Sequence, residues 1–361
     1  MIQLEGTITA LSPLHLGSGR SKGTFIPTLP YIPGRTLRGM AGYYLFKNDR
    51  ELFNDIGIDE ENDISKMGII FKNSYPVNND KRSVFSPSSV EWCKKCGNLL
   101  KKGETECDAI VDGMPCLNEG KKFSGLMDFD SHVNKKLSTI SGHFISIETK
   151  CPITRNGHTS MPENSALSPY HVESIGSGAK FRFRLLVKDE FADRIKEAFD
   201  RAGIFYGIGG FRSRGYGNVK FEFKESHDVE ALIEKRAGVL SGAGSKLLVA
   251  NSDMVIREGD YSIVGFDEHF LEYAQSTLES LGKNGIIKYS EPVEAKVSEG
   301  TARGWSLKQK NSLSEIIRCI GAGSCVRISG DGEAMAVLET FGIGEMINCG
   351  YGDVYFTGDA V

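Results

Sequence analysis

The sequence lacks any hydrophobic run that approaches the roughly 20 apolar residues needed to cross a bilayer. Its first residues, MIQLEGTITALSPLHLG, have neither the basic start nor the apolar centre of a signal peptide. An excess of positive charge is also missing, because 43 Lys and Arg stand against 47 Asp and Glu and the formal net charge is -4. We therefore expect a cytoplasmic protein without a membrane partner, in which any contact with a nucleic acid is local.

A length of 361 residues suits two domains, and a hydrophobic content of 40% is enough to form their cores. In the first half, the spacing of apolar residues predicts strands and helices in the following order: a strand over 2–12, a helix from Thr36, strands over 143–149 and 180–187, a helix capped by Asp189, and a strand over 218–223. The second half repeats the pattern, with a strand over 246–256, a helix from Asp267, strands over 286–297 and 325–329, and a helix from Asp331.

This order of elements is typical of the α+β class. A β-α-β-β-α-β order predicts two ferredoxin-like (RRM-like) domains in tandem, over 1–225 and 246–361. Residues 226–245, a charged helix followed by glycine and serine, are predicted to link them. The stretch from about 48 to 141 is polar and loses its periodicity, so we expect it to be an insertion in the first domain.

Two glycine-rich loops occupy the same place near the end of each half. The sequence GIGGFRSRGYGNV begins at Gly207, and GIGEMINCGYGDV begins at Gly342. Each follows a predicted helix and precedes a predicted strand, which indicates an internal repeat. Backbone N–H groups of the first loop, together with Arg212 and Arg214, could bind phosphates, while Tyr216 could stack on a base or pack beneath the loop. The second loop lacks both arginines, so we expect it to serve packing or protein contact more than phosphate binding.

A second basic segment lies between the first strand and the first helix. It supplies Arg20, Lys22, Arg35 and Arg38, which we expect to form a basic rim beside the first glycine loop, because the first and last strands of such a sheet are neighbours. An ordinary surface loop is the alternative. Helix-terminal amides near Arg35 add a further element that attracts anions.

Familiar catalytic arrangements are missing. The seven histidines are dispersed, and no nucleophile stands at a recognisable spacing from a base. His15 is the one alternative that stays open, as a general base in metal-independent RNA cleavage, although a lone histidine near a strand end is more often a packing residue. We therefore expect no catalytic residues.

Four cysteines crowd into the segment 93–116. Cys93 and Cys96 form a tight pair, and Cys107 and Cys116 follow at wider spacing. Four thiolates with one tight knuckle are typical of a structural Zn2+ site, so we predict a zinc ribbon here, with a surface thiol cluster as the alternative. Four protein ligands would leave no open position for catalytic water.

The segments SPLHLGSG, YIPGRTLRG and GGFRSRGYGNV resemble the RAMP superfamily of CRISPR-associated proteins. Within it, the cysteine ribbon after FKNSYPV, the segments GAGS and GWSLKQ, and the closing GIGEMINCGYGDV look like the large RAMP subunit of type III-D complexes, the Csx-ten family. The likeness spans nearly the whole chain.

The resemblance implies a Cas-five-like, noncatalytic subunit that grips the 5′ repeat-derived tag of the CRISPR RNA in antiviral defence. It implies contacts with the large polymerase-nuclease subunit and with backbone RAMP subunits of a type III effector complex, and only indirect contact with target RNA. Backbone subunits that cut target RNA carry an aspartate in the loop before YIPG, and SGRSKGTFIPTLPYIPG has none.

From the motifs and the resemblance together, one set of residues is predicted to bind RNA: Gly17, Ser18, Gly19, Arg20, Lys22, Arg35, Arg38, Gly209, Gly210, Arg212, Ser213, Arg214, Gly215, Tyr216 and Gly217. Two alternatives stay open: an endoribonuclease that processes precursor CRISPR RNA, and a purely protein-binding assembly subunit.

Overall fold

The structure is a computed structural model of a mixed α+β protein with several small sheets. It describes residues 1–18, 23–58, 60, 63–77, 83–100, 106–107, 110–111, 114–129, 131, 137–138, 144–151, 169–242, 244–302, 305–306, 312–313 and 316–357. None of the described helices has the length and hydropathy needed to cross a bilayer.

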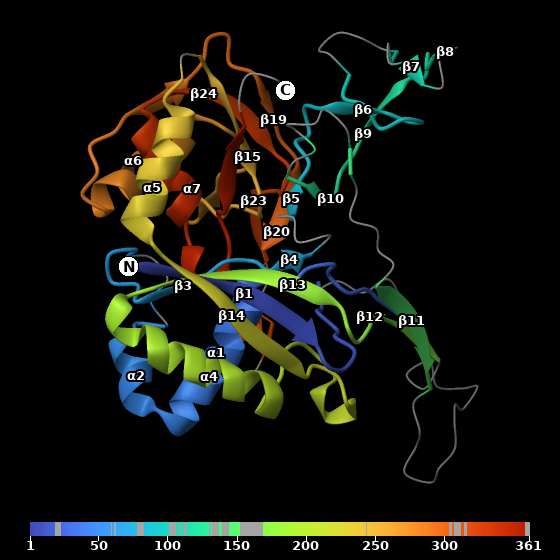
Figure 1. The fold of residues 1–361 in the computed structure, drawn as a ribbon, viewed down its shortest axis with the longest axis vertical. Helices are drawn as coiled ribbons and strands as arrows, with labels where there is room; N and C mark the ends of the chain where they lie inside the picture. The colour runs from blue at the N-terminus through green and yellow to red at the C-terminus, as the bar shows by residue number, and fades with distance from the viewer. Residues whose placement is uncertain are drawn as a thin grey trace.

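The first large sheet is antiparallel. Its path runs through β14 (Val219–Asp228), β1 (Ile2–Ala10), β13 (Lys180–Val187) and β3 (Ile69–Phe71), and β4 (Tyr75–Pro76) also pairs with β13. Figure 1 shows the helices on one side of this sheet: α1 (Gly34–Asn48), α2 (Arg50–Asp55) and α4 (Ala192–Phe205). A short 3-10 turn, η2 (Asp189–Phe191), leads into α4.

Strand β13 illustrates why this sheet forms. Phe181, Phe183 and Leu185 are fully buried on its helix-covered face, while Arg182 and Arg184 alternate with them on the other face. From α4, the ring of Phe199 packs edge-on against Phe221 at a centroid distance of 4.9 Å. The phenylalanines of this strand therefore face the helices, while Leu186 on the other face is buried in the hydrophobic cluster of the second half.

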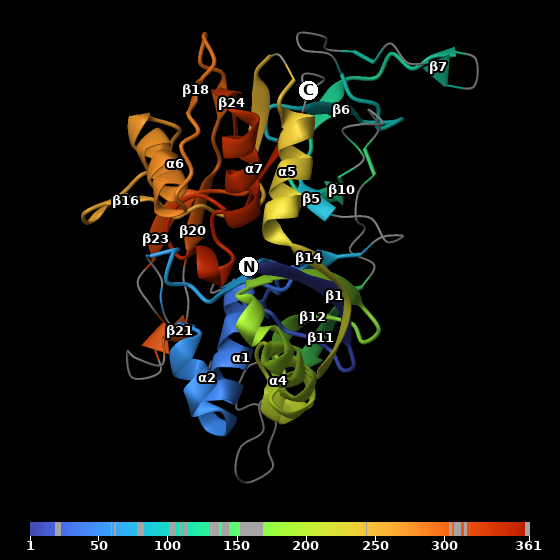
Figure 2. The same cartoon turned by 60° about the vertical axis from the view of Figure 1, so that its left-hand side comes forward.

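The second large sheet has the same strand order relative to the chain. Its path runs through β18 (Ile287–Tyr289), β24 (Cys325–Gly330), β15 (Lys246–Ala250) and β25 (Val354–Thr357), and β19 (Ala295–Lys296) also pairs with β24. Three helices pack with this half and stand side by side in Figure 2: α5 (Val229–Leu240), α6 (Glu268–Ser280) and α7 (Gly332–Phe341). The helices predicted from Asp267 and Asp331 are α6 and α7, and each of these aspartates caps its helix.

Smaller sheets surround these two. A three-stranded sheet contains β11 (Ile145–Lys150), β12 (Tyr170–Ile175) and β2 (Phe25–Ile26). The remaining pairs are β5 (Ser83–Phe85) with β10 (Leu126–Asp128), β6 (Glu91–Cys93) with β9 (Gly120–Lys122), β7 (Ile110–Val111) with β8 (Met114–Pro115), β16 (Arg257–Glu258) with β17 (Tyr261–Ser262), β20 (Glu299–Ala302) with β23 (Ile317–Ile320), and β21 (Trp305–Ser306) with β22 (Ser312–Leu313).

Several sequence predictions for the first half are wrong. The range 48–141 is not wholly an irregular insertion, because β3 lies in it and belongs to the first large sheet. The strand predicted over 143–149 corresponds to β11, which lies in the separate three-stranded sheet. Helix α1 begins at Gly34 instead of Thr36, and Asp189 begins η2 without capping α4.

The segment that carries the cysteines packs on the second half. Trp92, which is fully buried, and Val84 share a hydrophobic cluster with Leu247 and Val249 of β15 and with Tyr355 of β25. The base of the segment thus covers the face of the second sheet that α6 and α7 leave open. Figure 1 shows β6, β9 and the β7–β8 hairpin projecting beyond that half.

Candidate nucleic-acid interface and metal centre

The two glycine-rich loops share the backbone conformation of their central turn. Phe211 and Met346 take left-handed φ angles of 57° and 56°, and each begins a 3-10 turn, η3 (Arg212–Arg214) and η4 (Ile347–Cys349). Gly215 and Gly350 close these turns, each with a φ of 85°. The repeat seen in the sequence therefore extends to the backbone.

Each loop is fixed by the segment that follows the first strand of its own half. In the first loop, the N–H of Gly210 donates to the carbonyl of His15 at 2.8 Å. In the second, the N–H of Glu345 donates to the carbonyl of Val255 at 2.7 Å. Gly209 must be glycine, because its φ is +78° and a Cβ there would lie 2.4 Å from the His15 carbonyl oxygen. These bonds make both loops rigid.

The outer face of the first loop is basic. Arg212, Ser213, Arg214 and Gly215 are exposed. Arg212 donates from Nη1 to the carbonyl of Tyr206 at 3.1 Å, and Arg214 donates from Nη1 to the hydroxyl of Tyr170 at 2.5 Å. Each guanidinium carries five N–H groups, so these single bonds orient the arginines and leave further donors for an anion.

Tyr216 packs beneath the loop. It is buried, and its hydroxyl donates to Glu148 Oε2 of β11 at 2.9 Å. Lys150 also bonds to Glu148, and its Nζ lies 5.3 Å from the centre of the Tyr216 ring. Hydrogen bonds from Lys150 and Tyr216 lower the pKa of Glu148. Of the two roles predicted for Tyr216, the structure supports the packing role, which ties the loop to β11.

His15 is enclosed under the same loop. Its side chain is 5% exposed, its Nδ1 lies 2.8 Å from the carbonyl oxygen of Glu173, and its ring packs 5.0 Å from that of Phe211. Gly17 is exposed nearby and forms a bridge with Thr28. Ser18 is half-buried. The predicted residues Gly19, Arg20 and Lys22 lie outside the described residues.

Arg35 and Arg38 do not form a rim beside the first loop, so that prediction is wrong. Arg35 donates from Nη1 to the Tyr351 hydroxyl at 2.6 Å, and Arg38 from Nη1 to the Cys349 sulfur at 3.0 Å. Both contacts are to the second loop, because α1 begins against it. A Cβ on Gly34 would lie 2.9 Å from the Cys349 carbonyl oxygen, which shows how closely the two backbones approach.

The second loop is consequently covered where the first is open. Ile347, Asn348, Cys349 and Gly350 are buried under the start of α1. The expectation that this copy serves packing is confirmed. Its sequence explains the difference, since Ile347 and Cys349 stand where the first loop has Arg212 and Arg214.

Sequence reasoning missed Glu148, Lys150 and Tyr170. They lie on β11 and β12, and no motif or spacing links these strands to the loop at 207–217. Two signals were available: Glu148 lies on the strand predicted over 143–149 with Lys150 directly after its end, and the polar Tyr216 hydroxyl needs a partner when buried.

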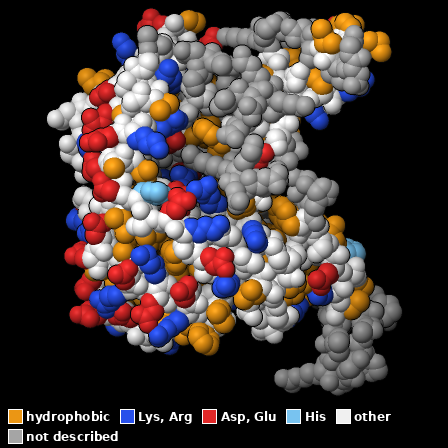
Figure 3. All heavy atoms as spheres, viewed as in Figure 1, with side chains coloured by type: hydrophobic (Ala, Val, Ile, Leu, Met, Phe, Trp, Pro, Cys, Tyr) orange, Lys and Arg blue, Asp and Glu red, His pale blue; other side chains and the backbone are white. Residues whose placement is uncertain are grey.

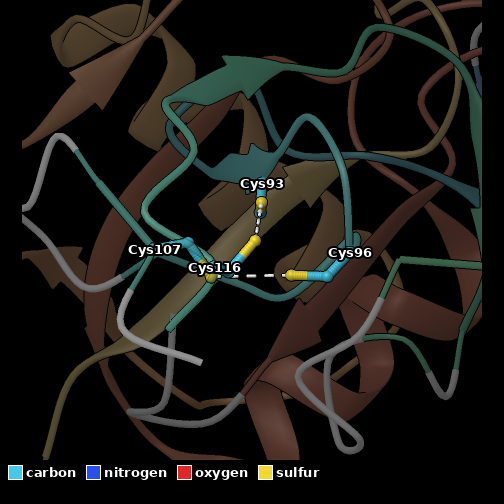
Figure 4. Close-up of side chains that lie close together, drawn as sticks. All are labelled: Cys93, Cys96, Cys107 and Cys116. Atoms are coloured by element: carbon cyan, nitrogen blue, oxygen red, sulfur yellow. Dashed lines mark hydrogen bonds between the residues drawn. The ribbon is translucent and has the colours of Figure 1, made fainter. Parts of the chain in front are cut away.

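The cysteine cluster forms a compact set of sulfur atoms. The Sγ atoms of Cys93, Cys96, Cys107 and Cys116 all lie within 4.8 Å of one another. Figure 4 shows the four side chains converging, with Cys93 and Cys116 3.6 Å apart and Cys96 and Cys107 3.5 Å apart. A tetrahedral Zn2+ with bonds of about 2.3 Å places its sulfurs about 3.8 Å apart. The cluster could therefore bind a metal.

Backbone N–H groups favour the thiolate form of one cysteine in this cluster. Burial opposes ionisation of Cys93, but hydrogen bonds from the backbone N–H groups of Cys96 and Lys95 outweigh it and lower the pKa of the Cys93 thiol to about 6. The thiolate is the form that ligates metals. Gly97, with a φ of 72°, closes the turn after Cys96.

The N-terminal part of the chain matches a known protein family. The sequence model of the RAMP superfamily matches residues 7–220, and the chain belongs to this superfamily. No curated protein matches the chain.

The chain is also similar to several solved structures, at low identity. One is a chain of the type III-B Cmr-beta complex bound to cognate target RNA and AMPPnP, with a TM-score of 0.46 and 11% identity over 91% of this chain and 86% of that chain. Another is a RAMP protein binding different RNA substrates, with a TM-score of 0.40 and 11% identity over 99% and 100%. A third is a Cas6-related protein from Pyrococcus furiosus, with a TM-score of 0.38 and 13% identity over 98% and 99%.

Proposed function

We propose that this chain is a noncatalytic CRISPR RNA-binding subunit of a type III effector complex, of the III-D-like Csx-ten family. It grips the 5′ repeat-derived tag of the CRISPR RNA. Membership of the RAMP superfamily supports the general class, and the motifs SPLHLGSG, YIPGRTLRG and GGFRSRGYGNV support the finer assignment.

One observation carries the RNA-binding part of the proposal. Two loops that share the conformation of their central turn differ in what surrounds them: the second is buried against α1, whereas the first exposes Arg212 and Arg214. A rigid turn with two oriented guanidinium groups suits a phosphate backbone, because charge-assisted bonds need no ordering of the donor at binding. A helix start like that of α1, which covers the second loop, carries a partial positive charge and would be repelled by Arg212 and Arg214. A polyanion therefore suits the first loop better than a second helix would.

The fold supports two ferredoxin-like domains in tandem, over 1–225 and 246–361. In both large sheets the strand order is fourth, first, third and second along the chain, which is the order of a β-α-β-β-α-β unit. Residues 226–245 join them, largely as α5, which packs against α7. The partners proposed for this arrangement are the large polymerase-nuclease subunit and the backbone RAMP subunits, with target RNA contacted indirectly.

The absence of catalysis is part of the proposal. His15, the alternative general base for an endoribonuclease, is 5% exposed and packed under Gly210 and Phe211, where an RNA strand has little access to its ring. Incubation of the purified chain with repeat RNA in EDTA tests this directly. A discrete cleavage product that disappears in His15→Ala would favour the nuclease instead.

We also propose that the cysteine cluster holds one structural Zn2+. Cys93, Cys96, Cys107 and Cys116 would supply all four ligands, and the ion would fix the ribbon over 93–116 on the second half of the protein.

The experiment that tests the RNA role is affinity for repeat-tag RNA. Replacing Arg212 and Arg214 by alanine should weaken binding by about tenfold or more, because each charge-assisted hydrogen bond contributes roughly 1.5–3 kcal/mol. Wild-type affinity in this double variant, with unchanged complex assembly, would contradict the proposal. Copurification with partner subunits but without RNA would favour the protein-binding alternative.

A further inference from the structure

An exposed apolar patch lies beside the first glycine loop. It consists of Tyr43 and Phe46 from α1 and of Ile204 and Phe205 from the end of α4, with exposed fractions of 44%, 42%, 51% and 76%. Figure 3 shows a small group of hydrophobic side chains at the lower edge of the molecule, among acidic and basic side chains. We refer to Tyr43, Phe46, Phe205 and the adjoining Tyr206 as the aromatic ledge.

The ledge is ordered although it is open to solvent. The ring of Tyr206 packs edge-on against Tyr43 at 5.1 Å and against Tyr44 at 5.8 Å. Asn48 donates from Nδ2 to the Tyr206 hydroxyl at 3.3 Å. Phe205 is different, because it makes no ring contact within the part of the chain that the structure describes. Its face is available to a flat ligand at little entropic cost.

Cations flank the ledge on two sides. The Arg50 guanidinium lies 3.9 Å from the centre of the Phe46 ring. Arg212 of the first loop bonds to the carbonyl of Tyr206, so the ledge is continuous with the proposed RNA-binding loop. The nearby Asp49 carboxylate pairs with Arg194 at 2.7 Å, and the same guanidinium lies 3.6 Å from the exposed Glu51. Flat rings between guanidinium groups suit a strand with stackable bases and a phosphate backbone.

We propose that the aromatic ledge stacks unpaired bases of the single-stranded RNA whose backbone is held by Arg212 and Arg214. This inference rests on the proposed function and extends it, because it names a contact to bases in addition to phosphates. Phe205 is the principal stacking surface and Tyr43 the second. Stacking on rings does not distinguish one base from another, so the ledge adds affinity with little sequence preference.

The test compares two RNAs of about ten nucleotides, one with all its bases and one in which the bases are replaced by abasic sites. Fluorescence anisotropy measures the binding of each to the wild-type chain, to Phe205→Ala, to Tyr43→Ala and to Phe205→Trp. Tyr261→Ala is the matched control, because Tyr261 is also an aromatic residue that is 79% exposed but lies on β17 in the other half.

The proposal expects Phe205→Ala to weaken binding of the base-containing RNA by about tenfold and to leave the abasic RNA unchanged. Phe205→Trp should retain affinity, and Tyr261→Ala should match the wild type. If Phe205→Ala and the wild type bind base-containing RNA equally well, the proposal that the aromatic ledge stacks bases is overturned. If Arg212→Ala still loses affinity in that case, the proposed function stands; if it does not, that function fails as well. If Phe205→Ala loses a copurifying protein but keeps its RNA affinity, the inference is also overturned. The ledge would then be a protein-binding surface.

Discussion

Lys72 Nζ lies 3.0 Å from Asp353 Oδ1, and the two side chains are 1% and 0% exposed. Lys72 follows β3 of the first sheet, whereas Asp353 precedes β25 of the second. The same lysine donates to the carbonyl of Phe341 at 2.9 Å, and Asn251 donates to Asp353 Oδ2 at 2.8 Å. This buried pair therefore fastens the two halves to each other.

Removing one partner should destabilise the protein strongly. Asp353→Asn removes the carboxylate charge that lies 3.0 Å from the buried Lys72 ammonium and 3.4 Å from the Arg184 guanidinium, which costs about 3–5 kcal/mol of unfolding free energy. Urea denaturation measures the change. The control is Glu299→Gln, which breaks the exposed pair with Arg318 and should cost less than about 1 kcal/mol. Equal stability of Asp353→Asn and the control would contradict the role of this pair.

Arg35 should matter for stability more than for RNA affinity. Its guanidinium bonds to the buried Tyr351 hydroxyl of the second loop, so Arg35→Ala leaves that group without its partner and should lower the free energy of unfolding by about 1–3 kcal/mol. Repeat-tag RNA should still bind with an affinity within about threefold of wild type. If Arg35→Ala instead loses much of its RNA affinity at unchanged stability, this prediction is contradicted and Arg35 is an RNA-binding residue.

The proposed metal site predicts both the zinc content of the protein and the solubility of its cysteine variants. Elemental analysis should find about one Zn2+ per chain, and Cys93→Ser with Cys96→Ser should abolish it and reduce solubility, because the loss of two ligands removes the metal that would hold the ribbon together. Cys151→Ser is the control, since Cys151 is exposed and outside the cluster. Absence of zinc from the wild type, or its retention in the double variant, would contradict the site.

The contact between Glu148 and Tyr216 should depend on pH. The pKa of Glu148 is lowered below its usual 4.5, so its contribution to stability is present above that value and is lost as the pH falls through the folded-state pKa. Glu148→Gln should therefore be less stable than wild type at neutral pH, by less than about 1 kcal/mol for this partly exposed group. The difference should shrink in denaturation curves recorded progressively below pH 4.5. A difference that persists unchanged into strong acid would rule out an ionised Glu148 as its source.

The sequence predicts the regular elements of this protein well where one face of each is buried. The alternation KFRFR marks the first part of β13 because its phenylalanines face helices, whereas Leu185, Leu186 and Val187 at its end are all buried. Strand β3 was missed because it spans only Ile69–Phe71 and is fully buried, so it shows no alternation. A three-residue apolar run in a polar stretch does not differ from a loop by periodicity.

The candidate site was predicted in part. Glycines with positive φ mark both loops, since few other residues adopt that conformation, and the cysteine spacing marks the cluster. Whether a loop is exposed or covered depends on how the two halves pack against each other. No local sequence pattern predicts this packing. Arg35 was therefore placed at the wrong loop, and Glu148 beneath the right one was overlooked.

The most direct test of the RNA-binding claim is the salt dependence of affinity for repeat-tag RNA. Each phosphate neutralised by a side chain contributes a slope of about -0.7 in a plot of log affinity against log salt for single strands. Because Arg212 and Arg214 are the exposed cations of the open loop, their replacement by alanine should reduce the slope by about 1.4. A slope identical to that of wild type would contradict the claim that this loop holds the RNA backbone.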